Sequence, residues 1–228
     1  MTSVLFGSIS TIADTSEMQR QAFNDAFAEH GLDWTWERAE YRRMLTGNGG
    51  RDRIASYAEE RGEDVDADAV HATKSRLFQE ALASSELEPR PGVAETIRAA
   101  ADAGHRCALV TTTSPQNVRA LLDAVSAHLP DEPFALVLDR DSIGDADGKP
   151  SPAAYEKALA DLGVDAGDAV AVEDNTGGVQ SARAAGIACA AFPNANTSDH
   201  DFGEATAEID RVDLDALLAL LSEKESHR

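Results

Sequence analysis

The sequence contains none of the long apolar runs or targeting segments that mark membrane and secreted proteins. No stretch reaches the roughly 18 apolar residues that a transmembrane helix needs. The N-terminus has no basic segment followed by a long apolar one, so we expect no secretory signal and a cytoplasmic protein. The six histidines are scattered without the spacing of metal ligands, which argues against a zinc site.

Cysteine, lysine and positive charge are also scarce. The two cysteines, Cys107 and Cys189, lie in apolar stretches and are predicted to be buried free thiols. The formal net charge is −21, from 41 acidic and 20 basic residues, so we expect neither nucleic acid nor an anionic membrane as a partner. Only four residues are lysines, which makes each of them informative, Lys149 above all.

The residues that are present predict a core domain with a smaller helical insertion. Hydrophobic residues make up 43% of the 228 positions, enough for a packed core. Between residues 16 and 87 the apolar positions recur at helical spacing, as at Phe23 and Phe27. We expect a further helix to begin at Trp34-Thr-Trp36, with both tryptophans either inside this helical region or facing a partner protein.

A different pattern follows Pro89, where short apolar segments alternate with helical ones. The predicted strands are residues 107–110, 134–138, 169–172 and 187–191, with a weaker one at 207–209 and the first strand directly before Gly7. This alternation indicates an α/β fold, a Rossmann-like doubly wound parallel sheet core with an inserted all-helical cap domain. The core is predicted to comprise residues 1–15 and 89–228, and the cap residues 16–88.

Polar and charged residues gather where the predicted strands end. Parallel strands bind ligands at their carboxyl ends, and this edge should unite Gly7–Thr11, Thr111–Ser114, the loop of Lys149, and Glu173–Asp174. Hydroxyl groups, free N–H groups and a lysine followed by Pro150 and Pro152, which fix the approach to the next helix, suit a phosphate, and adjacent carboxylates suit Mg²⁺. Each piece also has a simpler interpretation: a turn that caps the next helix, an ordinary loop lysine, and a helix N-cap at Asp174 or Asn175.

Taken together, the order and spacing of these pieces resemble a known family. The motifs are Phe6 with Thr11 and Ala13-Asp14-Thr15, then Arg90-Pro91-Gly92-Val93, Val110-Thr111-Thr112-Thr113-Ser114, Lys149-Pro150-x-Pro152-x-x-Tyr155, Glu173-Asp174-Asn175 and Ala184-Ala185-Gly186-Ile187. This set resembles the haloacid dehalogenase-like (HAD) superfamily over nearly the whole chain. It is most similar to the helical-cap branch that contains phosphoglycolate phosphatase and β-phosphoglucomutase-like proteins.

The resemblance implies a catalytic site from which two residues are missing. In the family the first motif supplies an aspartate nucleophile and an aspartate general acid/base, and these positions hold Gly7 and Ile9. The family pattern assigns phosphate binding to the positions of Thr111, Thr112 and Lys149. It assigns Mg²⁺ binding to those of Asp174 and Glu173, a set expected to be weakened by the loss of the first aspartate. These lists come from the resemblance alone.

The cap positions that could contact a substrate are Gln19 and Arg51. Gln19 stands where relatives often carry a histidine, and Arg51 closes the loop of residues 46–51 that matches the family's variable substrate loop. Arg51 could reach a substrate anion, or it could simply begin a helix after a flexible turn.

Three functions remain open on the sequence. The first is a HAD-like protein that binds a small phosphorylated metabolite, or a protein partner, with little or no phosphatase activity. The alternative is a Mg²⁺-dependent hydrolase of a small phosphate ester that avoids an aspartyl-phosphate. The third is an interaction role for the cap, with the old site idle. The oligomeric state is left open.

Overall fold

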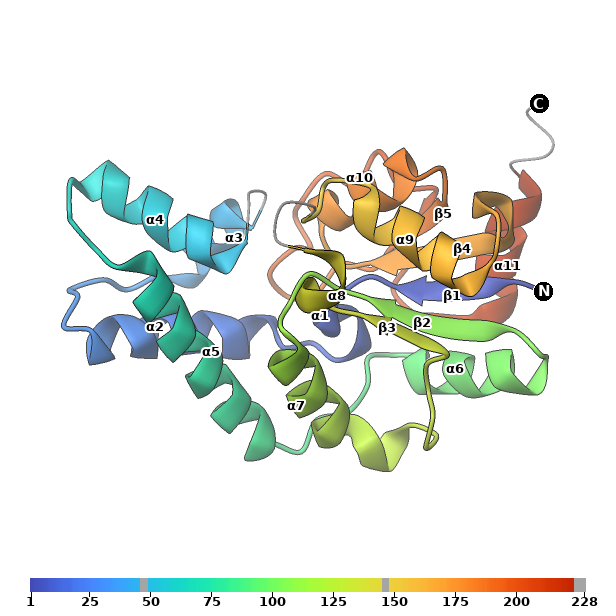
Figure 1. The fold of residues 1–228 in the computed structure, drawn as a ribbon, viewed down its shortest axis with the longest axis horizontal. Helices are drawn as coiled ribbons and strands as arrows, with labels where there is room; N and C mark the ends of the chain where they lie inside the picture. Colours follow the sequence, from blue (N-terminus) through green and yellow to red (C-terminus); the bar gives the residue numbers. More distant parts are fainter. Residues whose placement is uncertain (46–48, 145–147, 224–228) are drawn as a thin grey trace.

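The computed structural model describes residues 1–45, 49–144 and 148–223, and within them the core contains one six-stranded, all-parallel sheet in the order β3-β2-β1-β4-β5-β6. The strands are β1 Ser3–Phe6, β2 Arg106–Val110, β3 Leu136–Leu138, β4 Ala169–Glu173, β5 Ala188–Ala191 and β6 Ala207–Glu208. Figure 1 shows this sheet on one side of the molecule and a separate group of helices on the other. The predicted α/β fold with a doubly wound parallel sheet is therefore confirmed.

Helices cover both faces of the sheet. The core helices are α1 Ile9–Ile12, α6 Val93–Asp102, α7 Pro115–Val125, α8 Arg140–Ile143, α9 Ala153–Leu162, α10 Thr176–Ala184 and α11 Leu214–Glu223, with two short 3₁₀ turns at Ser126–His128 and Ala166–Asp168. One apolar cluster packs α6, α7 and α11 against one face, and a second packs α9 and α10 against the other. Because β1, β2 and β4 are buried on both faces, their sequences are almost continuously apolar.

The register of the central strands places the predicted site at one edge. Phe6 of β1 pairs with Leu109 of β2 and with Val172 of β4. The residues that follow these positions therefore leave the sheet at the same level, and this is the carboxyl edge at which ligands bind in such folds.

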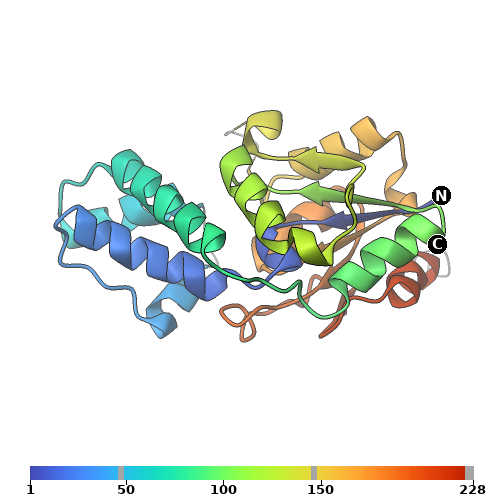
Figure 2. The same cartoon turned by 90° about the horizontal axis from the view of Figure 1, so that it is seen from below.

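The cap is entirely helical in the described residues. It consists of α2 Ser16–Glu29, α3 Arg38–Met44, α4 Gly50–Arg61 and α5 Ala67–Ala83, and Figure 2 shows α2 and α5 running side by side, away from the sheet. The predicted cap, residues 16–88, encloses these four helices, although the two limits themselves stay a prediction. Both cysteines are buried and unpaired, as expected. None of the described helices has the length and apolar character of a membrane span.

The prediction of a helix from Trp34 was wrong. The third helix begins only at Arg38, and Trp36 lies in an extended segment before it. Side chains of α2 bind both backbone groups of Trp36: Asn24 Oδ1 accepts from its N–H at 2.8 Å, and Arg20 Nη1 donates to its carbonyl at 2.9 Å. Both tryptophans are buried among aromatic rings of the cap, so they form its core and offer no surface to a partner.

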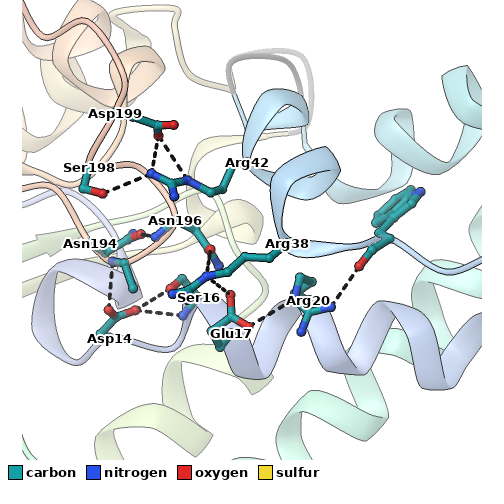
Figure 3. Close-up of polar contacts among 12 residues, drawn as sticks. Asp14, Ser16, Glu17, Arg20, Arg38, Arg42, Asn194, Asn196, Ser198 and Asp199 are labelled. Atoms are coloured by element: carbon teal, nitrogen blue, oxygen red, sulfur yellow. Dashed lines mark hydrogen bonds and ion pairs between the residues drawn. The ribbon is translucent and has the colours of Figure 1, made fainter.

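Polar contacts connect the cap to the core loop that follows β5 (Figure 3). Arg42 of α3 pairs with Asp199 at 2.5 Å, and Arg38 Nε donates to Asn196 Oδ1 at 3.3 Å. Ion pairs with exposed partners contribute about 1 kcal/mol or less each. The firmer connection is apolar, because Phe78 and Leu82 of α5 are buried in the same cluster as Val118 and Leu121 of α7.

Candidate active site

The structure brings three of the predicted strand-end segments into direct contact. Gly7 N donates to Val172 O at 2.9 Å, which extends the β1–β4 ladder by one residue. Lys149 Nζ donates to the carbonyl of Gly7 and, at 2.8 Å, to the carbonyl of Val110. Lys149 thus lies between the ends of β1 and β2.

Glu173, the last residue of β4, turns inward toward this lysine. Its Oε1 accepts from Lys149 Nζ at 2.6 Å and from the hydroxyl of Tyr155 at 2.7 Å. The residue is completely buried, and Oε2 has no hydrogen-bond partner. Burial raises the pKa of Glu173, while Lys149 and Tyr155 act in the opposite direction. A buried, hydrogen-bonded ion pair therefore occupies the centre of the site.

Two glycines make room for this carboxylate. A Cβ atom at Gly7 would overlap with the carboxylate of Glu173 and the hydroxyl of Tyr155, and one at Gly178 of α10 would overlap with the same carboxylate. The side chain of Glu173 therefore fills the space that a side chain at position 7 would need. In this conformation, an aspartate at position 7 and Glu173 exclude each other.

Position 9 lies in an apolar environment. Ile9 is the first residue of α1, a single turn whose N-cap is Ser8, and its side chain is 5% exposed. It belongs to the same apolar cluster as Phe78 of the cap and Ile12. The carboxylate that the family carries here would therefore be buried among hydrocarbon groups.

The carboxylates do not form a magnesium site in this arrangement. Mg²⁺ needs several oxygen ligands with free lone pairs, whereas Glu173 offers one unpartnered oxygen, Oε2, because its Oε1 is bound to Lys149 and Tyr155. Asp174 Oδ1 accepts from Ser8 at 2.7 Å, and Oδ2 accepts from Asn194 at 2.6 Å. Within residues 1–45, 49–144 and 148–223, no three His, Cys, Asp or Glu side chains come together as a metal site. The donor set present does not fit Mg²⁺.

The remaining predicted residues lie in different surroundings. Thr111 is buried at the end of β2, where its Oγ1 accepts from Thr113 N at 3.3 Å, and Thr112 beside it is partly exposed. Ser114 caps α7, as the simpler interpretation of this turn predicts. Arg51 lies on the cap surface in ion pairs with Asp52 and Asp68, and the neighbouring residues 46–48 fall outside the described part of the chain. Phosphate binding by these residues stays a prediction.

The sequence analysis missed a buried lysine in the cap. Lys74 of α5 is 4% exposed and donates to Gln19 Oε1 at 3.3 Å, with the rings of Phe23 and Phe78 4.8 Å from its Nζ. No carboxylate of the described residues forms an ion pair with it. Burial lowers the pKa of Lys74 to about 7, with Arg53 as the second cause. An unneutralised buried ammonium is costly, which suggests an anionic ligand.

Further basic side chains surround Lys74. Arg53 stacks over Tyr41, with its guanidinium carbon 5.6 Å from the ring centre. Burial lowers the pKa of His71 to about 4, helped by the charges of Lys74 and Arg140. We call Lys74, Arg53, His71 and Arg140 the basic cluster.

The basic cluster lies at the boundary between cap and core. Arg140 belongs to the core, and its N–H donates to Thr113 O at 2.9 Å. Gln19 links Lys74 to the first loop through Ser10 Oγ, at 3.3 Å. One sequence signal could have revealed the cluster, because Lys74 interrupts an apolar face with i, i+4 spacing at Val70, Phe78 and Leu82.

Comparison with known proteins identifies the family. The family model of haloacid dehalogenase-like hydrolases matches residues 2–186. The chain belongs to this family. Protein CbbY of Cereibacter sphaeroides is 39% identical over 210 residues, which cover 91% of this chain and 90% of that protein. The plasmid-encoded CbbY of Cupriavidus necator is 40% identical over 213 residues, covering 89% and 82%.

Solved HAD-like structures show the same arrangement of core and cap. A mutant of CbbY from Rhodobacter sphaeroides, in complex with xylulose-1,5-bisphosphate, superposes with a TM-score of 0.85 at 38% identity and covers 92% of this chain and 95% of that one. The CbbY complex with phosphate gives a TM-score of 0.84 at the same identity and coverage. Compared with the HAD pattern, this chain keeps Thr111, Lys149 and Asp174 but has no carboxylate at positions 7 and 9.

Proposed function

We propose that this protein binds a small phosphorylated sugar between cap and core and has little or no phosphatase activity. The observation that carries the proposal is the basic cluster, in which Lys74 is buried with no carboxylate partner among the described residues. A phosphate group would supply a negative partner for Lys74, for which the described residues provide no carboxylate. The complex of a CbbY relative with xylulose-1,5-bisphosphate supports a phosphorylated pentulose as the ligand class.

The first strand-end loop supports binding without turnover. Neither Gly7 nor Ile9 can attack phosphorus or transfer a proton, and Glu173 is buried and held by Lys149. The family pattern assigns phosphate binding to Thr111, Thr112 and Lys149, but the three N–H donors of Lys149 are already used, and we propose that the phosphate of the ligand binds at Lys74 instead. Mg²⁺ is the usual cofactor of HAD phosphatases, and we propose that its affinity for Asp174 and Glu173 is low here. A cytoplasmic location remains a prediction.

Calorimetry with xylulose 5-phosphate tests the binding. We expect Lys74→Met to weaken the affinity by at least about tenfold, because charge-assisted hydrogen bonds to phosphate contribute roughly 1.5–3 kcal/mol. The matched control is Lys157→Met, which removes an exposed lysine paired with Asp161 at 3.0 Å and should leave the affinity unchanged. Equal affinities for wild type and Lys74→Met would contradict the assignment of the ligand to the basic cluster.

Phosphate release distinguishes the binding function from the alternative hydrolase. We expect no release from xylulose 5-phosphate above that of a buffer control, with or without Mg²⁺. Mg²⁺-dependent hydrolysis without an aspartyl-phosphate predicts release that disappears in Asp174→Ala. If that pattern is observed, the protein is an enzyme and the proposal is wrong.

The pKa of Lys74 predicts a distinct pH dependence of stability. Folding lowers this pKa from 10.5 to about 7. Between these values the unfolded chain holds a proton that the folded chain has lost, so the free energy of unfolding rises with pH, by at most about 1.4 kcal/mol per pH unit. Urea denaturation from about pH 7 to about pH 8.5 should show this rise in wild type relative to Lys74→Met. If the free energy of unfolding changes with pH in the same way for wild type and Lys74→Met, Lys74 stays charged in the folded state.

The same deprotonation should weaken ligand binding. A neutral amine at Lys74 loses its ionic attraction to phosphate, so we expect the affinity for xylulose 5-phosphate to fall as the pH rises above about 7. The comparison with Lys74→Met again separates this residue from other titrating groups, including the two buried cysteines, whose pKa values burial raises. The affinity of Lys74→Met for xylulose 5-phosphate should depend less on pH than that of wild type.

A further inference from the structure

We infer that Glu173 restricts this protein to ligands with a single phosphate group, because it neutralises Lys149 and so keeps a second phosphate away from the ends of β1 and β2, which we call the core site. The inference rests on the proposed function and specifies its ligand. The basic cluster would bind the one phosphate, and a part of the ligand that carries no charge would face the core site.

The hydrogen-bonding capacity of Lys149 is already used. An ammonium group has three N–H donors. Those of Lys149 go to the carbonyl of Gly7, the carbonyl of Val110 and the carboxylate of Glu173. A phosphate oxygen could bind this ammonium only by displacing one of these acceptors, and two of them are backbone groups fixed in the sheet.

The charge of Lys149 is also already neutralised. The distance from Nζ to Glu173 Oε1 is 2.6 Å, and the side chains of Lys149 and Glu173 are 9% and 0% exposed. A phosphate group beside this pair would meet the carboxylate of Glu173 in an environment where water screens little of the repulsion. The core site therefore disfavours a second anion, although it contains Lys149 and Thr111, which the family pattern assigns to phosphate binding.

The space around Glu173 indicates that its position is built into the fold. Gly7 and Gly178 come from separate segments, and both leave the room that this carboxylate occupies. Tyr155 from α9 adds a hydrogen bond to Oε1 at 2.7 Å. Gly7 after β1, Tyr155 of α9 and Gly178 of α10 thus all accommodate the side chain of Glu173 in its inward-pointing conformation.

The lysine of the basic cluster differs from Lys149 because it has no carboxylate partner among the described residues. Lys74 donates one hydrogen bond, to the neutral amide of Gln19, and its ammonium has no carboxylate partner in the described chain. Lys149 is thus neutralised by a carboxylate of the described residues, whereas Lys74 is not. A sugar with one phosphate provides an anion for Lys74 and places no charge beside Glu173. A bisphosphate would bring its second phosphate towards Glu173.

The experiment compares xylulose 5-phosphate with xylulose 1,5-bisphosphate by calorimetry. For wild type we expect xylulose 1,5-bisphosphate to bind at least about tenfold more weakly than xylulose 5-phosphate. In Glu173→Gln, which keeps the shape and an acceptor oxygen but removes the charge, we expect the affinity for the bisphosphate relative to that for the monophosphate to rise at least about tenfold over the wild-type ratio. Glu156→Gln is the control, because Glu156 is an exposed glutamate on α9.

The possible results separate this inference from the proposed function. If wild type binds the bisphosphate as tightly as the monophosphate, or more tightly, Glu173 does not exclude the second phosphate and the inference is overturned, while the proposed function stands. This outcome needs no variant, so poor folding of Glu173→Gln cannot obscure it. If neither ligand binds to wild type or to Glu173→Gln, the proposed function is itself overturned.

Discussion

Gly7→Ala is expected to destabilise the fold by about 3 kcal/mol or more, although it adds a single methyl group. Overpacking of a filled core is costly, and here the methyl group also disturbs a buried ion pair. The new Cβ would overlap with the carboxylate of Glu173 and with the hydroxyl of Tyr155. Glu173 is completely buried, and moving its carboxylate away from the new methyl group would disturb its ion pair with Lys149 and its hydrogen bond from Tyr155. Urea denaturation of both proteins at the same pH measures the effect.

Gly177→Ala is the matched control. Gly177 precedes Gly178 in the first turn of α10, and its added Cβ would meet only Asn175 Oδ1, at 3.5 Å. Because alanine favours helix over glycine, this variant should be neutral or more stable by up to about 1 kcal/mol. Gly178→Ala, one residue later, should behave like Gly7→Ala. Equal stabilities for the Gly7 and Gly177 variants would show that Glu173 does not occupy the space beside position 7.

Restoring both family aspartates should not restore phosphatase activity. Gly7→Asp would place a second carboxylate against Glu173, and Ile9→Asp would bury a charge in an apolar cluster. Each change carries a desolvation cost of several kcal/mol, in the range of about 3–5 kcal/mol for an uncompensated buried charge. We expect the double variant to be strongly destabilised and to release no phosphate. Measurable turnover would mean that only the catalytic side chains had been lost and that the pocket still adapts to them.

The second large effect is expected from Lys149→Met. Removing the ammonium leaves Glu173 buried without its counter-ion, and breaking a buried pair in this way costs about 3–5 kcal/mol. The same substitution at Lys157, in an exposed pair with Asp161, should cost about 1 kcal/mol or less. Urea denaturation of both variants provides the comparison.

A double variant separates the loss of the ion pair from a loss of packing. Adding Glu173→Gln to Lys149→Met removes the unpaired charge, so we expect most of the lost stability to return. If the two changes are additive instead, the interaction between these side chains contributes little, and Lys149 acts mainly through its contacts with the backbone.

Much of the fold was predictable because its signals are local. Apolar strands that alternate with helices, and polar residues at the strand ends, predicted the parallel sheet and the edge at which Gly7, Lys149 and Glu173 meet. The predicted start of the third cap helix was wrong because the side chain of Asn24, twelve residues earlier in the sequence, accepts a hydrogen bond from the backbone N–H of Trp36. This contact holds Trp36 in an extended segment before α3.

The detailed site depended on contacts that sequence spacing does not reveal. The direction of Glu173 is set by the space beside Gly7 and Gly178, which come together only in the fold. Arg51 was selected in the cap, yet it pairs with Asp68 at the surface, whereas Arg53 lies beside Lys74. The motif Glu173-Asp174 therefore could not reveal that Glu173 is the counter-ion of Lys149. The resemblance to the family implied a metal ligand at this position.

Phosphorus NMR of the protein mixed with xylulose 5-phosphate at equal concentration tests the central claim most directly, since one spectrum reports both binding and cleavage. We predict that the phosphate ester resonance shifts or broadens on addition of wild type, stays unchanged with Lys74→Met, and is not replaced by inorganic phosphate over hours in the presence of Mg²⁺. Growth of the inorganic phosphate resonance, or an ester resonance that wild type leaves unchanged, would contradict a protein that binds a phosphorylated sugar without hydrolysing it.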